Sequence, residues 1–171
     1  MKHLTHIISL PRCRTAWLSQ ALTHAPLCYG LHDGIADHRE KRVMSPTEYA
    51  QSIRSLEAHF VTDCSSGIAS SIGHLTAFGG PIIVVTPDSE EARRDSWIEH
   101  MNDPSLYDQW QVIAGNFQTC RQMLKERIVL TVPMAELNDH MPAIWSVCCP
   151  GVVYPERRIR DLARLNIQEI N

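Results

Sequence analysis

The stretch from Leu4 to Leu22, LTHIISLPRCRTAWLSQAL, limits the possible folds most strongly, because it reads as a strand, a loop and a helix in succession. An apolar run stops at Pro11, and Thr15 is placed to cap a helix whose apolar residues recur at helical spacing. The loop carries Arg12 and Arg14, which would meet backbone N–H groups and the positive end of the helix dipole. This arrangement predicts a binding site for a phosphate or sulfate group. The alternative is that the two arginines only solvate a loop between buried elements.

The rest of the chain alternates short apolar runs with segments of helical periodicity. The clearest run is IIVVT between Pro81 and Pro87, which is typical of a fully buried parallel strand. Ser45, Pro46 and Glu48 form a helix start, whereas the polar residues 32–45 are expected to be a surface loop. Further strands are expected at residues 27–30, 59–62 and 128–132. The alternation predicts an α/β domain with a parallel sheet of four or five strands, the first of them central.

Length and composition favour one ordinary globular domain. The chain has 171 residues, of which 44% are hydrophobic and 20% charged, so residues 1–171 are expected to form a single domain with a substantial core. The formal net charge of −3 argues against nucleic acid or an anionic membrane as the main partner. No secretory signal or membrane-spanning stretch is recognisable. The six cysteines lack a C-x-x-C pair, which suits reduced thiols, and a cytoplasmic location is expected.

A metal site is not expected, although the chain contains nine histidines. His3 and His6 would face opposite sides of a strand, and the other histidines lack a matched set of ligands at metal spacing. A second strand-to-helix junction is more informative. Asp63 and Ser65 follow the predicted strand at 59–62, and parallel strands end at the same edge of a sheet. Asp63 and Ser65 are therefore expected to face the anion site.

The loop sequence PRCRTAWL resembles that of the sulfotransferase family, whose pattern is close to PKSGTTWL and binds the 5′-phosphosulfate of the donor PAPS. The matching residues are Pro11, Thr15, Trp17 and Leu18. The departures are Arg12 for the family's catalytic lysine, Cys13 for a serine, Arg14 for a glycine and Ala16 for a second hydroxyl residue. The chain resembles short sulfotransferase-like P-loop proteins of bacteria and phages more closely than it resembles the large animal enzymes.

The resemblance implies a P-loop NTPase-like three-layer sandwich and a transferase. Such a protein would move a sulfuryl group from a PAPS-like nucleotide to a hydroxyl or amine of a small-molecule acceptor, leaving PAP, and would need no metal. The residues that would bind the donor in the loop are Pro11, Arg12, Cys13, Arg14, Thr15, Ala16 and Trp17. The family also holds the donor's 3′-phosphate with an arginine and, eight residues later, a serine. Here Pro87 stands at the arginine position, so Arg93 and Arg94 are the candidate substitutes, with Ser96 near the serine position.

The transfer also requires a general base that takes the acceptor's proton. Arg12 would contact the transferring group and clamp its charge, but an arginine stays protonated and cannot exchange a proton as the family's lysine can. Asp63 is the first candidate for the base and His32 the second. The family's carboxyl-terminal loop for the 3′-phosphate, usually RKG, is absent.

Two other function classes remain open. A P-loop nucleotide or small-molecule kinase would need Mg²⁺ and the pattern G-x-x-x-x-G-K-[ST], yet no glycine occurs between Met1 and Tyr29. A non-catalytic nucleotide- or anion-binding protein would keep the loop and lose turnover. The missing 3′-phosphate residues make this second class a real competitor.

Overall fold

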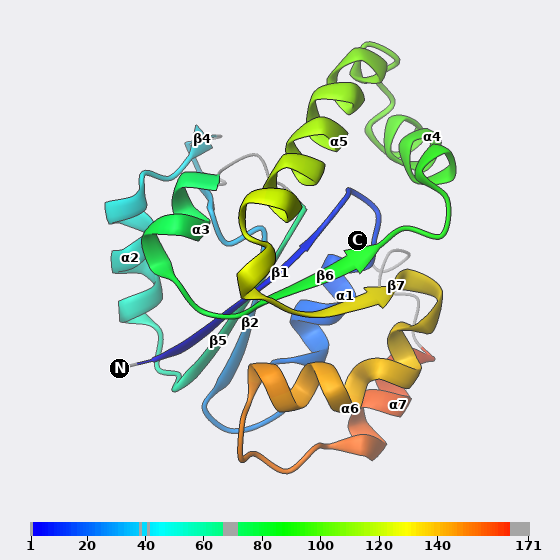
Figure 1. The fold of residues 1–171 in the computed structure, drawn as a ribbon. Coiled ribbons are helices and arrows are strands. Elements are labelled where there is room, and N and C mark those ends of the chain that lie inside the picture. The colour runs from blue at the N-terminus through cyan, green and yellow to red at the C-terminus, as the bar shows by residue number, and fades with distance from the viewer. Residues whose placement is uncertain (1, 38, 41, 67–71, 165–171) are drawn as a thin grey trace.

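The computed structural model describes residues 2–37, 39–40, 42–66 and 72–164. Its centre is a five-stranded, all-parallel sheet with the strand order β2-β5-β1-β6-β7 (Figure 1). The strands are β1 (His3–Ser9), β2 (Cys28–His32), β5 (Phe60–Ser65), β6 (Ile82–Thr86) and β7 (Ile128–Pro133). The predicted α/β class and the central place of the first strand are therefore confirmed.

Helices cover both faces of the sheet, which gives a three-layer arrangement (Figure 1). One layer contains α1 (Thr15–Ala21), α6 (Leu137–Cys148) and α7 (Glu156–Ala163). The other contains α2 (Pro46–Ser55), α3 (Ile72–Phe78) and α5 (Leu106–Met123). The remaining helix, α4 (Glu90–Met101), packs beside α5 near the carboxyl end of β6. Two short 3₁₀ turns, Lys125–Arg127 and Met134–Glu136, flank β7.

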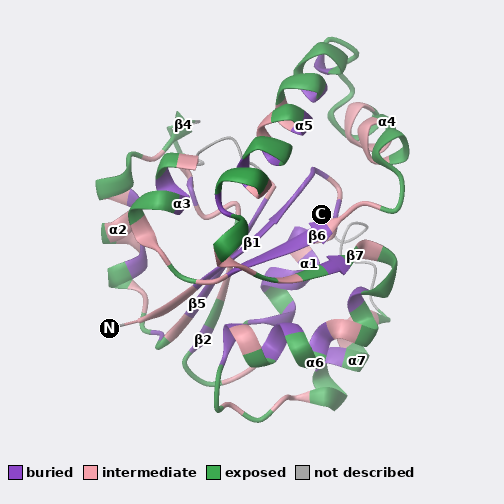
Figure 2. Cartoon of the chain, viewed as in Figure 1, coloured by how far each residue is buried: buried purple, intermediate pink, exposed green. Residues whose placement is uncertain are grey.

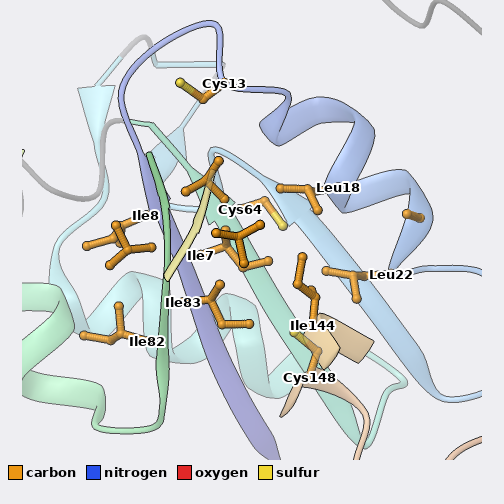
Figure 3. Close-up of a cluster of buried hydrophobic side chains, with 14 of the residues drawn as sticks. Ile7, Ile8, Cys13, Leu18, Leu22, Cys64, Ile82, Ile83, Ile144 and Cys148 are labelled. Carbon is orange, nitrogen blue, oxygen red and sulfur yellow. The ribbon is translucent and has the colours of Figure 1, made fainter. Parts of the chain in front are cut away.

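The core lies between the central strands and the helices on either side. All positions of β6 except the last are buried, and so are the last five positions of β1 (Figure 2). Ile7 and Ile83 meet Leu18 of α1 and Ile144 of α6 on one face, whereas Ile8 lies on the other face (Figure 3). Burial on both faces explains why these strands read as continuous apolar runs instead of alternating patterns.

The first helix is held against the sheet by a close backbone approach. A Cβ atom at Gly30 of β2 would lie 2.0 Å from the backbone oxygen of Ser19, so only glycine fits between this strand and α1. The Gly30 N–H also donates to Oγ1 of Thr23, 3.0 Å away. These contacts fix the position of α1, and with it the loop that precedes the helix.

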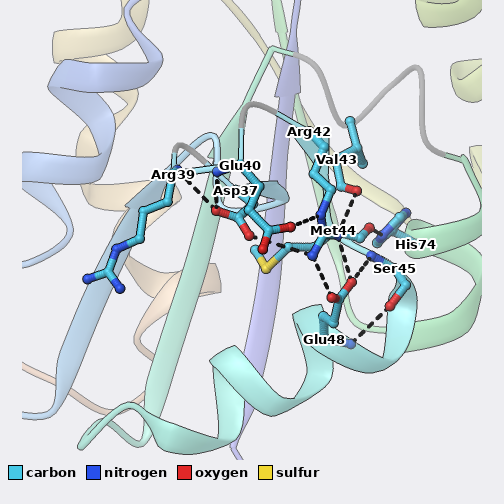
Figure 4. Close-up of polar contacts among 9 residues, drawn as sticks. All are labelled: Asp37, Arg39, Glu40, Arg42, Val43, Met44, Ser45, Glu48 and His74. Atoms are coloured by element: carbon cyan, nitrogen blue, oxygen red, sulfur yellow. Dashed lines mark hydrogen bonds and ion pairs between the residues drawn. The ribbon is translucent and has the colours of Figure 1, made fainter.

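The segment predicted as a surface loop, residues 32–45, contains a small antiparallel ribbon of β3 (Ala36–Asp37) and β4 (Arg42–Val43). Arg42 joins this ribbon to α2, because its guanidinium donates to both carboxylate oxygens of Glu48 at 2.6 and 2.9 Å and to Glu40 at 2.5 Å (Figure 4). Glu48 is also the acidic residue of a capping box with Ser45, as the helix-start signal predicts. The predicted surface loop therefore contains a short ribbon that the sequence did not predict, because a two-residue strand is too short to leave a sequence pattern.

Candidate functional site

A cavity of about 330 Å³ opens at the carboxyl end of β1, the central strand. The chain leaves β1 toward α1 on one face of the sheet, whereas the neighbouring strands β5 and β6 lead to helices on the other face. Divergent connections of this kind leave a crevice in open α/β sheets. The lining residues are Pro11, Arg12, Arg14, Thr15, Ala16, His32, Asp33, Ser66, Trp97, His100 and Met101.

The loop between β1 and α1 has an unusual backbone. Arg12 and Arg14 both adopt positive φ, at 66° and 62°, and Cys13 between them does not. A non-glycine residue in this region costs about 1–2 kcal/mol, and such strain concentrates at binding sites. Left-handed residues next to others in a loop also occur in the backbone nests whose N–H groups bind anions.

The start of α1 differs from the prediction. Arg14 in the left-handed conformation is the N-cap residue, no side chain caps the helix, and Thr15 is its first residue. With seven residues, α1 is also too short to contribute much through its dipole. The positive potential of the cavity therefore comes chiefly from the two guanidinium groups.

Arg14 is partly buried beside the cavity. Its guanidinium carbon lies 4.8 Å from the centroid of the Trp17 ring, a cation–π contact. Within the described part of the chain, no carboxylate lies at ion-pair distance from it. Burial lowers the pKa of Arg14, which means that the charged form has lost favourable hydration. An anion in the cavity would compensate for that loss.

Arg12 joins the loop to α4. Its Nε donates to Oγ of Ser96 at 3.3 Å, and Nη1 of Arg93 donates to the backbone oxygen of Arg12 at 3.3 Å. Arg93 also forms an ion pair with Asp88, with 3.4 Å between Nε and Oδ1. Ser96 and Arg93, both expected near the 3′-phosphate, thus form hydrogen bonds with Arg12 of the loop. Arg94 points elsewhere, because it pairs with Asp95 at 2.9 Å and does not line the cavity.

His32, the second candidate base, lies inside the cavity at the end of β2. Its Nε2 is 3.2 Å from Oγ1 of Thr15 and 3.6 Å from a carboxylate oxygen of Asp33. The other Asp33 oxygen accepts a hydrogen bond from the backbone N–H of Ser66 at 3.2 Å. An imidazole, a hydroxyl group and a carboxyl group thus lie together in the lining that also contains the two arginines.

Asp63, the first candidate base, lies elsewhere. The strand β5 extends to Ser65, so Asp63 is inside the sheet, fully buried, and not in the cavity lining. Its carboxylate accepts hydrogen bonds from Tyr49 Oη at 2.8 Å, Ser65 Oγ at 2.6 Å and the Gly34 N–H at 3.1 Å. Burial nevertheless raises the pKa of Asp63, against the effect of these donors. The expectation that Asp63 and Ser65 face the anion site is therefore wrong.

The side chains of Cys13 and Trp17 pack into the core and anchor the loop and the start of α1. Cys13 is fully buried, and burial raises the pKa of its thiol to about 12. Trp17 is also buried, and its indole N–H donates to the backbone oxygen of Leu162 at 3.4 Å. Neither side chain lines the cavity, in contrast to Pro11 of the loop and Ala16 of α1.

Four lining residues were not singled out from the sequence: Ser66, Trp97, His100 and Met101. Three of them belong to α4, a helix in which no residue is buried. Among the described residues, no group of three or more His, Cys, Asp or Glu side chains is placed to hold a metal ion. No helix in the described ranges is long and apolar enough to cross a membrane. The sequence matches no protein-family model and no protein with a curated description.

Proposed function

We propose that this chain is a sulfotransferase-like P-loop protein that binds a PAPS-like phosphosulfate nucleotide and transfers its sulfuryl group to a small-molecule acceptor. Arg12 contacts the transferring group, Arg14 a second anionic oxygen, and the hydroxyl of Thr15 together with the loop N–H groups binds the 5′-phosphate. The nucleotide supplies an activated sulfate on a phosphate leaving group. No metal ion is needed, because the guanidinium groups stabilise the negative charge that develops on the leaving oxygen.

The observation that carries this proposal is the environment of the Arg14 side chain and the conformation of its backbone. Arg14 is a partly desolvated cation without a carboxylate partner in the described chain, it lines the cavity, and its backbone conformation is strained, which together suit an oxyanion site. The cavity volume is also at the lower end of the range for small-molecule sites, which is about 300–1,000 Å³.

His32 replaces Asp63 as the proposed base. It lines the cavity, and an imidazole accepts protons near neutral pH, whereas Asp63 is buried within its own hydrogen-bond network. The hydrogen bond with Thr15 keeps His32 beside the loop where the transferred group would lie.

A second candidate is a nucleotide- or anion-binding protein without turnover. It is favoured by the ion pairs of Arg94 and by the contacts of Arg93 with the loop, because these leave neither arginine directed at a 3′-phosphate. In that case inorganic anions and PAP would bind, and no sulfuryl transfer would follow.

Thermal unfolding with added ligands tests the proposal. A ligand at about 100 times its Kd stabilises the fold by about 2.7 kcal/mol, which raises the Tm of a chain of this size by about 5–10 °C. We expect PAP to produce such a shift, more strongly than inorganic sulfate, and Arg14→Ala to abolish it. Arg157→Ala, which removes one exposed charge from α7, is the matched control and should leave the shift unchanged.

Incubation with PAPS and a mixture of acceptors, followed by mass spectrometry, then separates the candidates. Appearance of PAP together with a sulfated product supports the transferase, and binding without product supports the second candidate. Stabilisation by ATP with Mg²⁺ but not by PAP would instead indicate a kinase. If no ligand stabilises the wild type, or if Arg14→Ala retains the full shift, the anion site itself is refuted.

A further inference from the structure

Asp33 carries the one carboxylate among the described residues that line the cavity. It follows β2 directly and adopts positive φ, at 50°. Aspartate tolerates this left-handed conformation better than most residues, although some strain remains. Its N–H donates to the backbone oxygen of Cys64 in β5 at 3.3 Å, and its own backbone oxygen accepts from the N–H of Ala36 at 2.8 Å. The backbone of Asp33 is therefore held against the neighbouring strand.

The side chain of Asp33 is held as well. Its Oδ1 accepts a hydrogen bond from the backbone N–H of Ser66, the residue after β5, at 3.2 Å. The second carboxylate oxygen, Oδ2, lies 3.6 Å from Nε2 of His32. This distance is too long for a hydrogen bond and short enough for a strong electrostatic interaction. Because the backbone and Oδ1 are both tied to the end of β5, Oδ2 stays beside the imidazole.

Two oxygen atoms thus lie near the same nitrogen of His32, and they constrain its proton differently. Oγ1 of Thr15 is 3.2 Å from Nε2, and a hydroxyl group can donate or accept, so Thr15 is compatible with either tautomer of a neutral imidazole. An ionised carboxylate can only accept. An unprotonated Nε2 would direct its lone pair at the negative charge of Asp33. The carboxylate therefore favours the tautomer with the proton on Nε2.

We propose that Asp33 is a positioning residue that keeps the proton of neutral His32 on Nε2 and thereby makes Nδ1 the atom that accepts the proton of the acceptor group. This inference rests on the proposed function, in which His32 is the base. When the proton passes to Nδ1, Nε2 keeps its own proton and the carboxylate of Asp33 stays ionised beside the imidazolium. Its charge stabilises that cation, an effect that solvent weakens because the two side chains are 30% and 44% exposed.

A purely structural role, in which Asp33 only joins the ends of β2 and β5, is separable from this one by a single substitution. In Asp33→Asn the new side chain also tolerates the left-handed conformation, and its amide oxygen can still accept from the N–H of Ser66. The amide NH₂ group then takes the place of Oδ2 and points a donor at His32. A donor favours an unprotonated Nε2, so the substitution should keep the link between the strands and move the proton to Nδ1.

Nuclear magnetic resonance reads the tautomer without relying on turnover. Long-range proton–nitrogen correlation spectra at about pH 8.5, where a free imidazole is neutral, distinguish the protonated ring nitrogen from the unprotonated one, and His32→Gln assigns the signals. We expect the Nε2–H form of His32 to be in about tenfold excess in the wild type and the Nδ1–H form to predominate in Asp33→Asn. Thr15→Val should retain the Nε2–H form. Asp37→Asn, which changes a carboxylate outside the cavity lining, is the matched control and should leave the His32 signals unchanged.

Several outcomes overturn the inference. A predominant Nδ1–H form in the wild type refutes it directly, and so does its loss of the Nε2–H form in Thr15→Val, which would assign the control to the hydroxyl group. An unchanged tautomer in folded Asp33→Asn reduces Asp33 to a link between two strands. Saturating PAP should shift the His32 signals of the wild type, and unchanged signals would place the pair outside the donor site. Failure of the proposed function is distinguishable from these, because PAP would then give no thermal shift, whereas the tautomer measurements need no ligand.

Discussion

Lowering the pH should destabilise the fold through one histidine of the central strand. His6 of β1 is fully buried, and burial, assisted by the nearby charge of Arg127, lowers its pKa from 6.5 to about 3. Below pH 6.5 the unfolded chain therefore binds a proton at His6, whereas the folded chain does not bind it until the pH falls to about 3. One pKa unit corresponds to about 1.36 kcal/mol, so His6 alone should remove about 2.7 kcal/mol of stability between pH 7.5 and pH 4.5.

Urea unfolding followed by tryptophan fluorescence at pH 7.5, 6.0 and 4.5 measures this loss in the wild type and in His6→Leu. The leucine variant cannot titrate at this position, so its free energy of unfolding should fall by about 2.7 kcal/mol less over the same range. Asp63, which pairs with His6 across β1 and β5, titrates in both proteins and cancels from the comparison. His59→Gln, an exposed histidine, should behave like the wild type. If His6→Leu loses stability as steeply as the wild type, the buried imidazole is not the acid-sensitive group.

Two further substitutions test the scaffold of the site. Tyr49→Phe removes one donor from the buried carboxylate of Asp63 and should cost about 1.5–3 kcal/mol in urea unfolding; a similar cost in an Asp63→Asn background would contradict the assigned hydrogen bond. Gly30→Ala would push a Cβ atom into the backbone oxygen of Ser19 and should lower the free energy of unfolding by about 1–3 kcal/mol. Gly115→Ala, whose Cβ meets nothing within 4 Å in helix α5, should instead be neutral or stabilising, and equal effects of the two would refute the packing argument.

Much of the fold follows from local patterns in the sequence. The run IIVVT between two prolines is β6, and Ser45, Pro46 and Glu48 begin α2 with a capping box, because these signals depend on neighbouring residues alone. The ends of the strands were predicted less accurately than their positions in the chain. β5 continues to Ser65, since pairing with β1 and β2 overrides the low strand preference of its polar residues. That extension is why Asp63 is a core residue and does not line the cavity.

Some of the residues that line the cavity belong to the predicted loop, and others do not. The loop with Arg12 and Arg14 follows from a contiguous motif, and the structure places both side chains at the cavity. Trp97, His100 and Met101 line the cavity because of where the distant helix α4 packs, which no local pattern encodes. One signal was present: α4 is strongly charged, and Trp97 is its only aromatic residue, so that ring has no apolar stripe of its own helix to join.

The buried thiol of Cys13, which is part of the loop between β1 and α1, makes opening of that loop measurable by chemical labelling. Cys13 stands between the two arginines, is fully shielded, and has a thiol whose pKa burial raises to about 12. The other five cysteines are buried as well, and the pKa of each of their thiols is raised. Alkylation of the native chain at Cys13 therefore requires the backbone on either side of it to move. The rate of alkylation at this one position therefore reports how often the loop opens, without an engineered cysteine, and an anion bound at the loop should slow that rate.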